Sequence, residues 1–285
     1  MSKSTAFKKL ALCSLTGAAM VAASQGAVAH TRLETNTVVE RTRVHNQINV
    51  GHGCDSEATI GTTVVFPNAV SYSPVIGVDS GAGRVFTTTA AADYYSPLAG
   101  IGTLMRVGGP WEMVNNKVDE KGSKDGFWAG GKPYDQTIAT VIGVEFYSAA
   151  VTIKAESCAR SVTFYPTIAD ICSTTPSATA SAKDVQIWSP IPNFDGVPGQ
   201  PFDVGNPYSL YDGYADAAHT TKAGGWNSPA SLKVTRNLAI NPLPAGCTGN
   251  GGAGDDVFVY PSAEQINKEL PVWSNPDQTG TNYWQ

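Results

Sequence analysis

Short stretches of alternating apolar and polar residues are the feature that most restricts the fold of this chain. In residues 38–50 the even positions include Val and Ile, while the odd positions include Arg, His, Gln and Asn. Similar stretches occupy residues 60–66, 140–146, 151–153 and 162–165, with Gly, Pro and Asn between them. A period of two is typical of half-buried strands, and many short strands joined by turns indicate an antiparallel β-sandwich. We therefore expect an all-β fold.

Helical periodicity is weak, and the best candidate for a helix is residues 262–270. The segment 173–182 is rich in Ser, Thr and Ala, which is typical of a linker. After it the chain is rich in Trp and Pro and has a glycine cluster at residues 249–254. We expect a sandwich over residues 30–174 and a loop-rich β extension over residues 175–285, whose role its residues do not indicate.

The first 29 residues have the pattern of a signal peptide. Three lysines precede an apolar run from Leu10 to Ala23, and Ala27-Val28-Ala29 is a small-x-small cleavage site. Cleavage after Ala29 would leave His30 as the first residue of the mature protein. We therefore expect a periplasmic or secreted protein.

The charge of the mature chain disfavours two classes of partner. Three of the 19 basic residues leave with the signal peptide, so 16 remain against 24 acidic residues, a net charge of −8. A chain this acidic has no electrostatic footprint for nucleic acid or an anionic membrane surface. No later apolar stretch approaches the roughly eighteen residues of a membrane span, so no membrane anchor is expected.

Four cysteines remain after cleavage: Cys54, Cys158, Cys172 and Cys247. An even number in an oxidising compartment predicts two disulfides, with three possible connectivities. A disulfide at Cys247 would staple the C-terminal extension to the sandwich. No spacing is the short CxxC pair of a thiolate metal site.

A histidine at the mature N-terminus has a particular metal chemistry. His30 would offer its free α-amine and a ring nitrogen, which together can chelate copper, and such nitrogen ligands suit Cu(II). The alternative is that His30 merely follows the cleavage site. Nucleophile-elbow, phosphate-loop, HExxH and EF-hand patterns are absent from the sequence, so hydrolytic and nucleotide chemistry have no support.

Several motifs in residues 30–172 carry a resemblance to a known family. In chain order they are His30-Thr31-Arg32-Leu33-Glu34, His52-Gly53-Cys54-Asp55, the 59–67 strand ending in Phe66-Pro67, Gly109-Pro110-Trp111, Phe127-Trp128-Ala129-Gly130-Gly131-Lys132, and Val162-Thr163-Phe164-Tyr165-Pro166 with Cys172 beyond it. In this order they resemble the YcnI-like copper-binding domain family.

This resemblance implies a fibronectin/immunoglobulin-like β-sandwich that holds Cu(II) with an N-terminal histidine, an acidic side chain and a nearby tryptophan. By analogy His30 is the histidine and Trp128 is the tryptophan. The resemblance also implies Cys54–Cys172 and Cys158–Cys247 disulfides and a role in copper homeostasis, with a copper chaperone or a membrane copper transporter as partner.

The acidic ligand is open between two residues. Glu34 lies four residues from His30, about 13 Å along an extended strand, which is too far to share a metal unless the chain turns. Glu40 is the better candidate, because a following strand could pair back beside His30 and Glu40 falls on the apolar even face. The alternative is that Glu40 is solvated at the start of its strand. The predicted metal residues are therefore His30, Glu40 and Trp128.

Three functions follow from these patterns. The first is a non-enzymatic, exported copper-binding protein. The second is a copper enzyme that resembles lytic polysaccharide monooxygenases, which would need a second histidine beside His30. The other histidines are His45, His52 and His219. We expect His45 to be exposed and His52 to make a structural hydrogen bond. The third is a secreted surface or adhesion module that works through the C-terminal extension.

Overall fold

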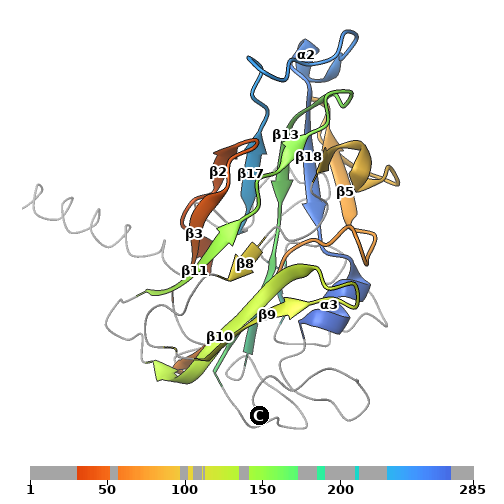
Figure 1. Cartoon of the computed structure of the whole chain (residues 1–285). Helices are drawn as coiled ribbons and strands as arrows, with labels where there is room; N and C mark the ends of the chain where they lie inside the picture. Colours follow the sequence, from red (N-terminus) through yellow and green to blue (C-terminus); the bar gives the residue numbers. More distant parts are fainter. Residues whose placement is uncertain are drawn as a thin grey trace, which may run out of the picture.

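The computed structural model is an all-β fold with a few short helices (Figure 1). It describes residues 31–51, 57–96, 102–104, 111, 113–134, 141–172, 185–189, 209–211 and 230–270. Within these residues the strands form three sheets, called sheets 1, 2 and 3 below, and a two-stranded ribbon. Among the helices in this part of the chain, none has the length and apolar character needed to cross a membrane.

The strands of each sheet are given in their spatial order. Sheet 1 contains β1 (Arg32–Leu33), β3 (Val44–Val50), β11 (Ile142–Ser148) and β8 (Gly102–Leu104). Sheet 2 contains β16 (Ser209–Tyr211), β15 (Val185–Ser189), β14 (Thr167–Ile171), β4 (Thr59–Val65), β10 (Lys124–Tyr134) and β9 (Met113–Val118). Sheet 3 contains β2 (Thr37–Val39), β17 (Leu232–Thr235), β13 (Ala159–Phe164), β18 (Asp255–Tyr260), β5 (Val75–Asp79) and β6 (Arg84–Thr87).

The remaining elements are small. The ribbon pairs β12 (Thr152–Ile153) with β7 (Tyr95–Ser96), next to the 3₁₀ helix η2 (Ala91–Asp93). The α-helices are α2 (Gly249–Gly252) and α3 (Ala263–Glu269), and α3 lies beside β9 and β10 (Figure 1). Strand pairing is mainly antiparallel, and the parallel pairs are β13 with β18, β15 with β16 and β17 with β2.

The sequence pattern predicted five of these elements, and one of its predictions needs a correction. The strands expected near residues 60–66, 140–146, 151–153 and 162–165 are β4, β11, β12 and β13, and the expected C-terminal helix is α3. The single strand expected over residues 38–50 is wrong, because β2 ends at Val39 and β3 begins only at Val44. Arg41 between them has a φ of 65°, a left-handed conformation that breaks a strand.

Strands from both sides of the predicted boundary at residue 174 share two sheets. Strands β17 and β18 flank β13 in sheet 3, and β15 pairs with β14 in sheet 2. The predicted Cys158–Cys247 disulfide is present. Cys172 is also disulfide-bonded, but Cys54 lies outside the described residues, so the Cys54–Cys172 pairing stays a prediction. The predicted linker at residues 173–182 lies outside them as well.

Sheet 2 is covered on both faces, which explains why every residue of β4 is buried. The main apolar core includes Val64 and Phe127 on one face, and Phe127 packs against Phe146 of sheet 1 with ring centroids 5.5 Å apart. A second apolar cluster on the other face includes Val65 and Ile266 of α3. Side chains that alternate along the strand therefore reach two different cores.

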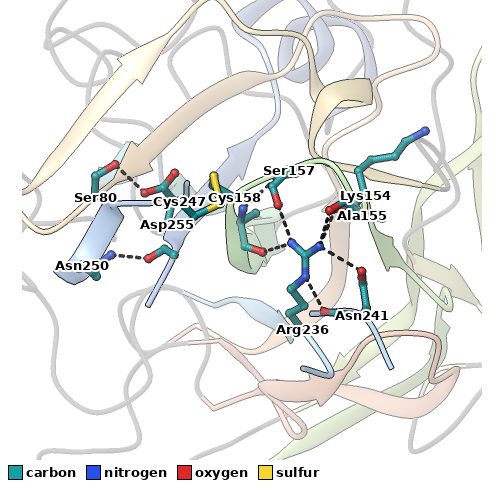
Figure 2. The surroundings of a disulfide bond; sticks show 12 residues. Ser80, Lys154, Ala155, Ser157, Cys158, Arg236, Asn241, Cys247, Asn250 and Asp255 are labelled. Carbon is teal, nitrogen blue, oxygen red and sulfur yellow. Dashed lines mark hydrogen bonds between the residues drawn. A yellow bond between two sulfur atoms is a disulfide. The ribbon is translucent and has the colours of Figure 1, made fainter. Parts of the chain in front are cut away.

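A buried arginine beside the disulfide donates hydrogen bonds to several backbone carbonyls (Figure 2). Arg236 donates hydrogen bonds to the carbonyls of Lys154, Ala155, Ser157, Ala159 and Asn241, over distances of 2.7–3.1 Å. Burial of the guanidinium lowers the pKa of Arg236 below its ordinary value, and neighbouring Glu40 opposes that shift. These contacts hold the start of β13 to the segment that follows β17.

Removing the disulfide should weaken the fold strongly. Cys158 and Cys247 are 89 residues apart, and in the chain-entropy model a crosslink of that span stabilises a protein by about 4.6 kcal/mol. We expect the double substitution Cys158→Ala/Cys247→Ala to lower the free energy of unfolding by about that amount. Urea titration under non-reducing conditions would measure it, and a loss below about 1 kcal/mol would contradict the prediction.

Candidate functional site

The residue that follows His30 is held by a buried carboxylate of sheet 2. The hydroxyl of Thr31 donates to Asp170 Oδ2 at 2.5 Å. Trp188 Nε1 donates to the same oxygen at 2.8 Å, and the Thr62 hydroxyl donates to Oδ1 at 2.9 Å. Thr31, Thr62 and Asp170 are almost completely buried, and Trp188 is 6% exposed. We call these four residues the Asp170 cluster.

The register of sheet 2 places these side chains on one face. Asp170 of β14 lies opposite Thr62 of β4, and Ile168 lies opposite Trp188 of β15. Directly opposed residues share a face, as do residues two apart along a strand. Asp170, Thr62 and Trp188 therefore gather on the face that carries the main core.

Charged groups taken out of water need hydrogen-bond partners, and the cluster supplies three donors to one carboxylate. The donors come from two strands, β4 and β15, and from the N-terminal segment. Thr31 leads into β1, whose Arg32 lies opposite Asn49 of β3. The chain immediately after residue 30 is thus fixed by a side-chain bond to sheet 2 and by a strand pair in sheet 1.

The structure places Glu40 far from this cluster. Thr31 precedes β1 and lies near the Val50 end of β3, whereas Glu40 precedes the Val44 end. The length of β3 separates them by about 20 Å at 3.3 Å per residue.

Glu40 is 3% exposed, so it is not the solvated residue considered as the alternative. Its oxygens accept hydrogen bonds from the backbone N–H groups of Ile153 and Asn237, both at 2.9 Å, and from Asn241 Nδ2 at 3.1 Å. The carboxylate therefore joins the β2–β3 turn to the segment after β17. Its role as a metal ligand stays a prediction.

Trp128 is also separated from the Asp170 cluster. It lies opposite Thr63 in β4, while its neighbour Ala129 lies opposite Thr62. Because alternate residues point to opposite faces, the indole of Trp128 lies on the other face of sheet 2 from Asp170. The tryptophan on the same face as Asp170 is Trp188.

The histidines are mostly outside the described part of the chain: His30, His52 and His219 all fall there. His45 is described, and its side chain is 50% exposed and 3.7 Å from Glu145, as expected for the polar face of β3. Glu34 is exposed and accepts a hydrogen bond from Asn49 Nδ2 at 2.5 Å. Among the described residues, no three His, Cys, Asp or Glu side chains form a group that could hold a metal ion.

Sequence reasoning missed Asp170 and Trp188. A signal for Asp170 was present, because Thr167-Ile168-Ala169-Asp170-Ile171 places one acid in an otherwise apolar strand that is buried on both faces. Such a residue needs partners from neighbouring strands. Those partners could not be identified without the strand order.

Comparisons with known proteins assign no family to this chain. No family model matches the chain, and no curated protein matches its sequence. An uncharacterised immunoglobulin-like protein from Nocardia farcinica is 12% identical with a TM-score of 0.31, and the match covers 73% of this chain and 98% of that one. A type II cohesin, A11, from Bacteroides cellulosolvens is 12% identical with a TM-score of 0.24, over 55% of this chain and 84% of that one.

Removing the hydroxyl of Thr31 tests whether its hydrogen bond to Asp170 anchors the N-terminal segment. A hydrogen bond to a charged group contributes about 1.5–3 kcal/mol, so Thr31→Val should lower the free energy of unfolding by about 2 kcal/mol. Thr31→Ser keeps the hydroxyl donor, so its free energy of unfolding should fall by less. Thr37→Val is a matched control, because Thr37 is exposed and its hydroxyl donates to its neighbour Asn36. Equal urea midpoints for Thr31→Val and Thr37→Val would contradict the anchor.

Proposed function

We propose that this protein is an exported, non-enzymatic copper-binding protein that holds one Cu(II) at its mature N-terminus. His30 would supply its α-amine and a ring nitrogen. The observation that carries the proposal is the bond from Thr31 to buried Asp170, because it fixes the chain next to the chelating residue. Bound Cu(II) would serve copper homeostasis, in exchange with a copper chaperone or a membrane copper transporter.

The acidic ligand in this proposal is Asp170 rather than Glu40. Consecutive Cα atoms are about 3.8 Å apart, so a metal held by residue 30 would lie close to the carboxylate that binds residue 31. Amine, imidazole and carboxylate form a nitrogen and oxygen donor set that suits Cu(II). Trp188 would be the neighbouring tryptophan. This arrangement keeps the ligand types of the YcnI-like pattern but assigns two of them to other residues.

An enzyme-like brace would need a second histidine beside His30, and His45 is the histidine that the structure describes. His45 lies on the exposed face of β3 near its Val44 end, opposite Tyr147 of β11. About 16 Å of strand separates it from the Val50 end, where Thr31 lies. His45 is therefore badly placed to share a metal with residue 30.

Cu(II) titration of two matched proteins tests the N-terminal chelate. One begins at His30, verified by mass spectrometry, and the other carries one additional N-terminal glycine. The native start should bind one Cu(II) with an electron paramagnetic resonance spectrum of few nitrogen ligands, and the extended protein should bind much more weakly because its amine is displaced. Equal binding by both proteins, or none by either, would overturn the proposal. Three nitrogens in the spectrum would favour the enzyme-like brace.

Substituting the two carboxylates distinguishes the two acidic candidates. Asp170→Asn should weaken Cu(II) binding at least about tenfold, a loss seen even for outer partners of metal ligands. Glu40→Gln should keep the affinity and lower the free energy of unfolding, because Gln can satisfy only part of the Glu40 donor set. The reverse pattern of affinities would show that Glu40 is the ligand.

A further inference from the structure

A second set of buried ionisable groups lies between α3 and sheet 2. It contains Lys117 of β9, Asp125 of β10 and Glu269 of α3, with exposed fractions of 3%, 0% and 7%. Two buried amides, Asn68 and Gln265, complete what we call the α3 cluster. Charges are costly to bury, and groups whose protonation burial perturbs cluster at functional sites.

Local strand geometry puts Lys117 beside Asp125. Lys117 lies opposite Gly126, and Val118 lies opposite Lys124, so Asp125 is an extra residue in a bulge of β10. Bulges redirect side chains and are common next to reactive sites. Helix α3 then covers both residues, and the side chain of Ser262 caps its start by accepting from the Gln265 N–H.

Hydrogen bonds bring the groups of the cluster together. Lys117 Nζ donates to the backbone carbonyl of Glu269. Gln265 Nε2 donates to Glu269 Oε2 at 3.0 Å and to Asp125 Oδ2 at 3.2 Å, and Asn68 Nδ2 donates to the same Asp125 oxygen at 2.8 Å. Asp125 Oδ1 has no hydrogen-bond partner within the described residues.

Burial gives the amine and the acid unusual protonation states. It lowers the pKa of Lys117 to about 7, although Glu269 and Asp125 oppose the shift. Burial, with a hydrogen bond and repulsion from Glu269, raises the pKa of Asp125 to about 8. Near neutral pH much of the lysine is therefore an unprotonated amine, while Asp125 is mainly a neutral carboxylic acid. An unprotonated amine is nucleophilic, and the hydroxyl group of a neutral carboxylic acid can leave as water.

We propose that Lys117 and Asp125 condense to an intramolecular isopeptide bond. Lys117 Nζ attacks Asp125 Cγ, a bond forms between them, and the bond from Cγ to the protonated Oδ1 breaks. One water molecule leaves, nothing is oxidised or reduced, and the product is a secondary amide.

The remaining members of the cluster have roles in this step. The amide N–H groups of Asn68 and Gln265 point at Oδ2, where negative charge develops when the amine adds to Cγ, as in an oxyanion hole. Glu269 interacts with both reacting residues and is placed to take the proton from nitrogen and return it to the leaving oxygen. The bond would lock the β9–β10 hairpin and replace a buried amine and a buried acid with one neutral amide. It does not depend on copper.

Mass spectrometry of the reduced, mature protein tests the bond directly. The intact mass should be lower by one water than the mass calculated from the sequence. Lys121 and Lys124 lie between the two residues, so trypsin should separate an unlinked pair. A tryptic species in which the peptide carrying Lys117 is joined to the peptide carrying Asp125 is the expected result. The full calculated mass with both peptides free would overturn the proposal.

Loss of water has one competing source that the experiment must distinguish. Asp125 precedes Gly126, and an Asp-Gly sequence can cyclise to a succinimide, which also loses water. A succinimide leaves the chain cleavable at Lys117 and hydrolyses at alkaline pH, whereas the isopeptide does neither. An intact mass lower by one water, together with tryptic cleavage after Lys117, would therefore refute the isopeptide bond.

Variants give a second line of evidence. Lys117→Met should restore the full calculated mass, and the matched substitution Lys121→Met, at a lysine whose amine bonds the Val70 carbonyl at an exposed position, should leave the water loss unchanged. Glu269→Gln should slow the reaction, so that linked and unlinked forms coexist. A linked fraction in Glu269→Gln equal to that of the parent would remove Glu269 from the mechanism, and water loss in Lys117→Met would overturn the bond itself.

Discussion

The cost of removing a carboxylate from water shapes the connections between distant parts of this fold. Glu40, Asp170 and Asp125 are all buried, and each is surrounded by donors from segments far apart in sequence. Glu40 joins the β2–β3 turn to Asn241, Asp170 joins the N-terminal segment to sheet 2, and Asp125 joins β10 to α3. An unpaired buried charge would cost several kcal/mol, so each carboxylate fixes the position of the segments that satisfy it.

The three carboxylates differ in what surrounds them. Glu40 accepts from amide groups and Asp170 from hydroxyl and indole groups, so neutral donors satisfy both. Asp125 instead faces another carboxyl group and a buried amine, and one of its oxygens makes no hydrogen bond within the described residues. Well-satisfied carboxylates stabilise structure, whereas a crowded one is held in a reactive protonation state. This contrast is why the α3 cluster supports a proposal of covalent chemistry.

The sequence predicted β4, β11, β12 and β13 from their period-two patterns, and it predicted α3; the family resemblance implied the Cys158–Cys247 disulfide. It did not predict the turn at Arg41, because the alternation of side chains continues in register across that turn. It also could not assign Asp170, Trp188 or the α3 cluster, because their partners are set by strand order and helix docking. Alternation along a strand identifies a face, but only the sheet topology identifies what that face contacts.

The position of the N-terminal segment has a consequence for the proposed copper site. The first residues of most domains are poorly ordered unless they are tied down, and a chelate on a loose end loses affinity to the entropy of ordering it. Here the N-terminal segment is held by the buried hydroxyl of Thr31, which donates to Asp170. The same carboxylate also accepts a hydrogen bond from Trp188. The ordering cost at residue 31 is therefore met during folding, before any ligand binds.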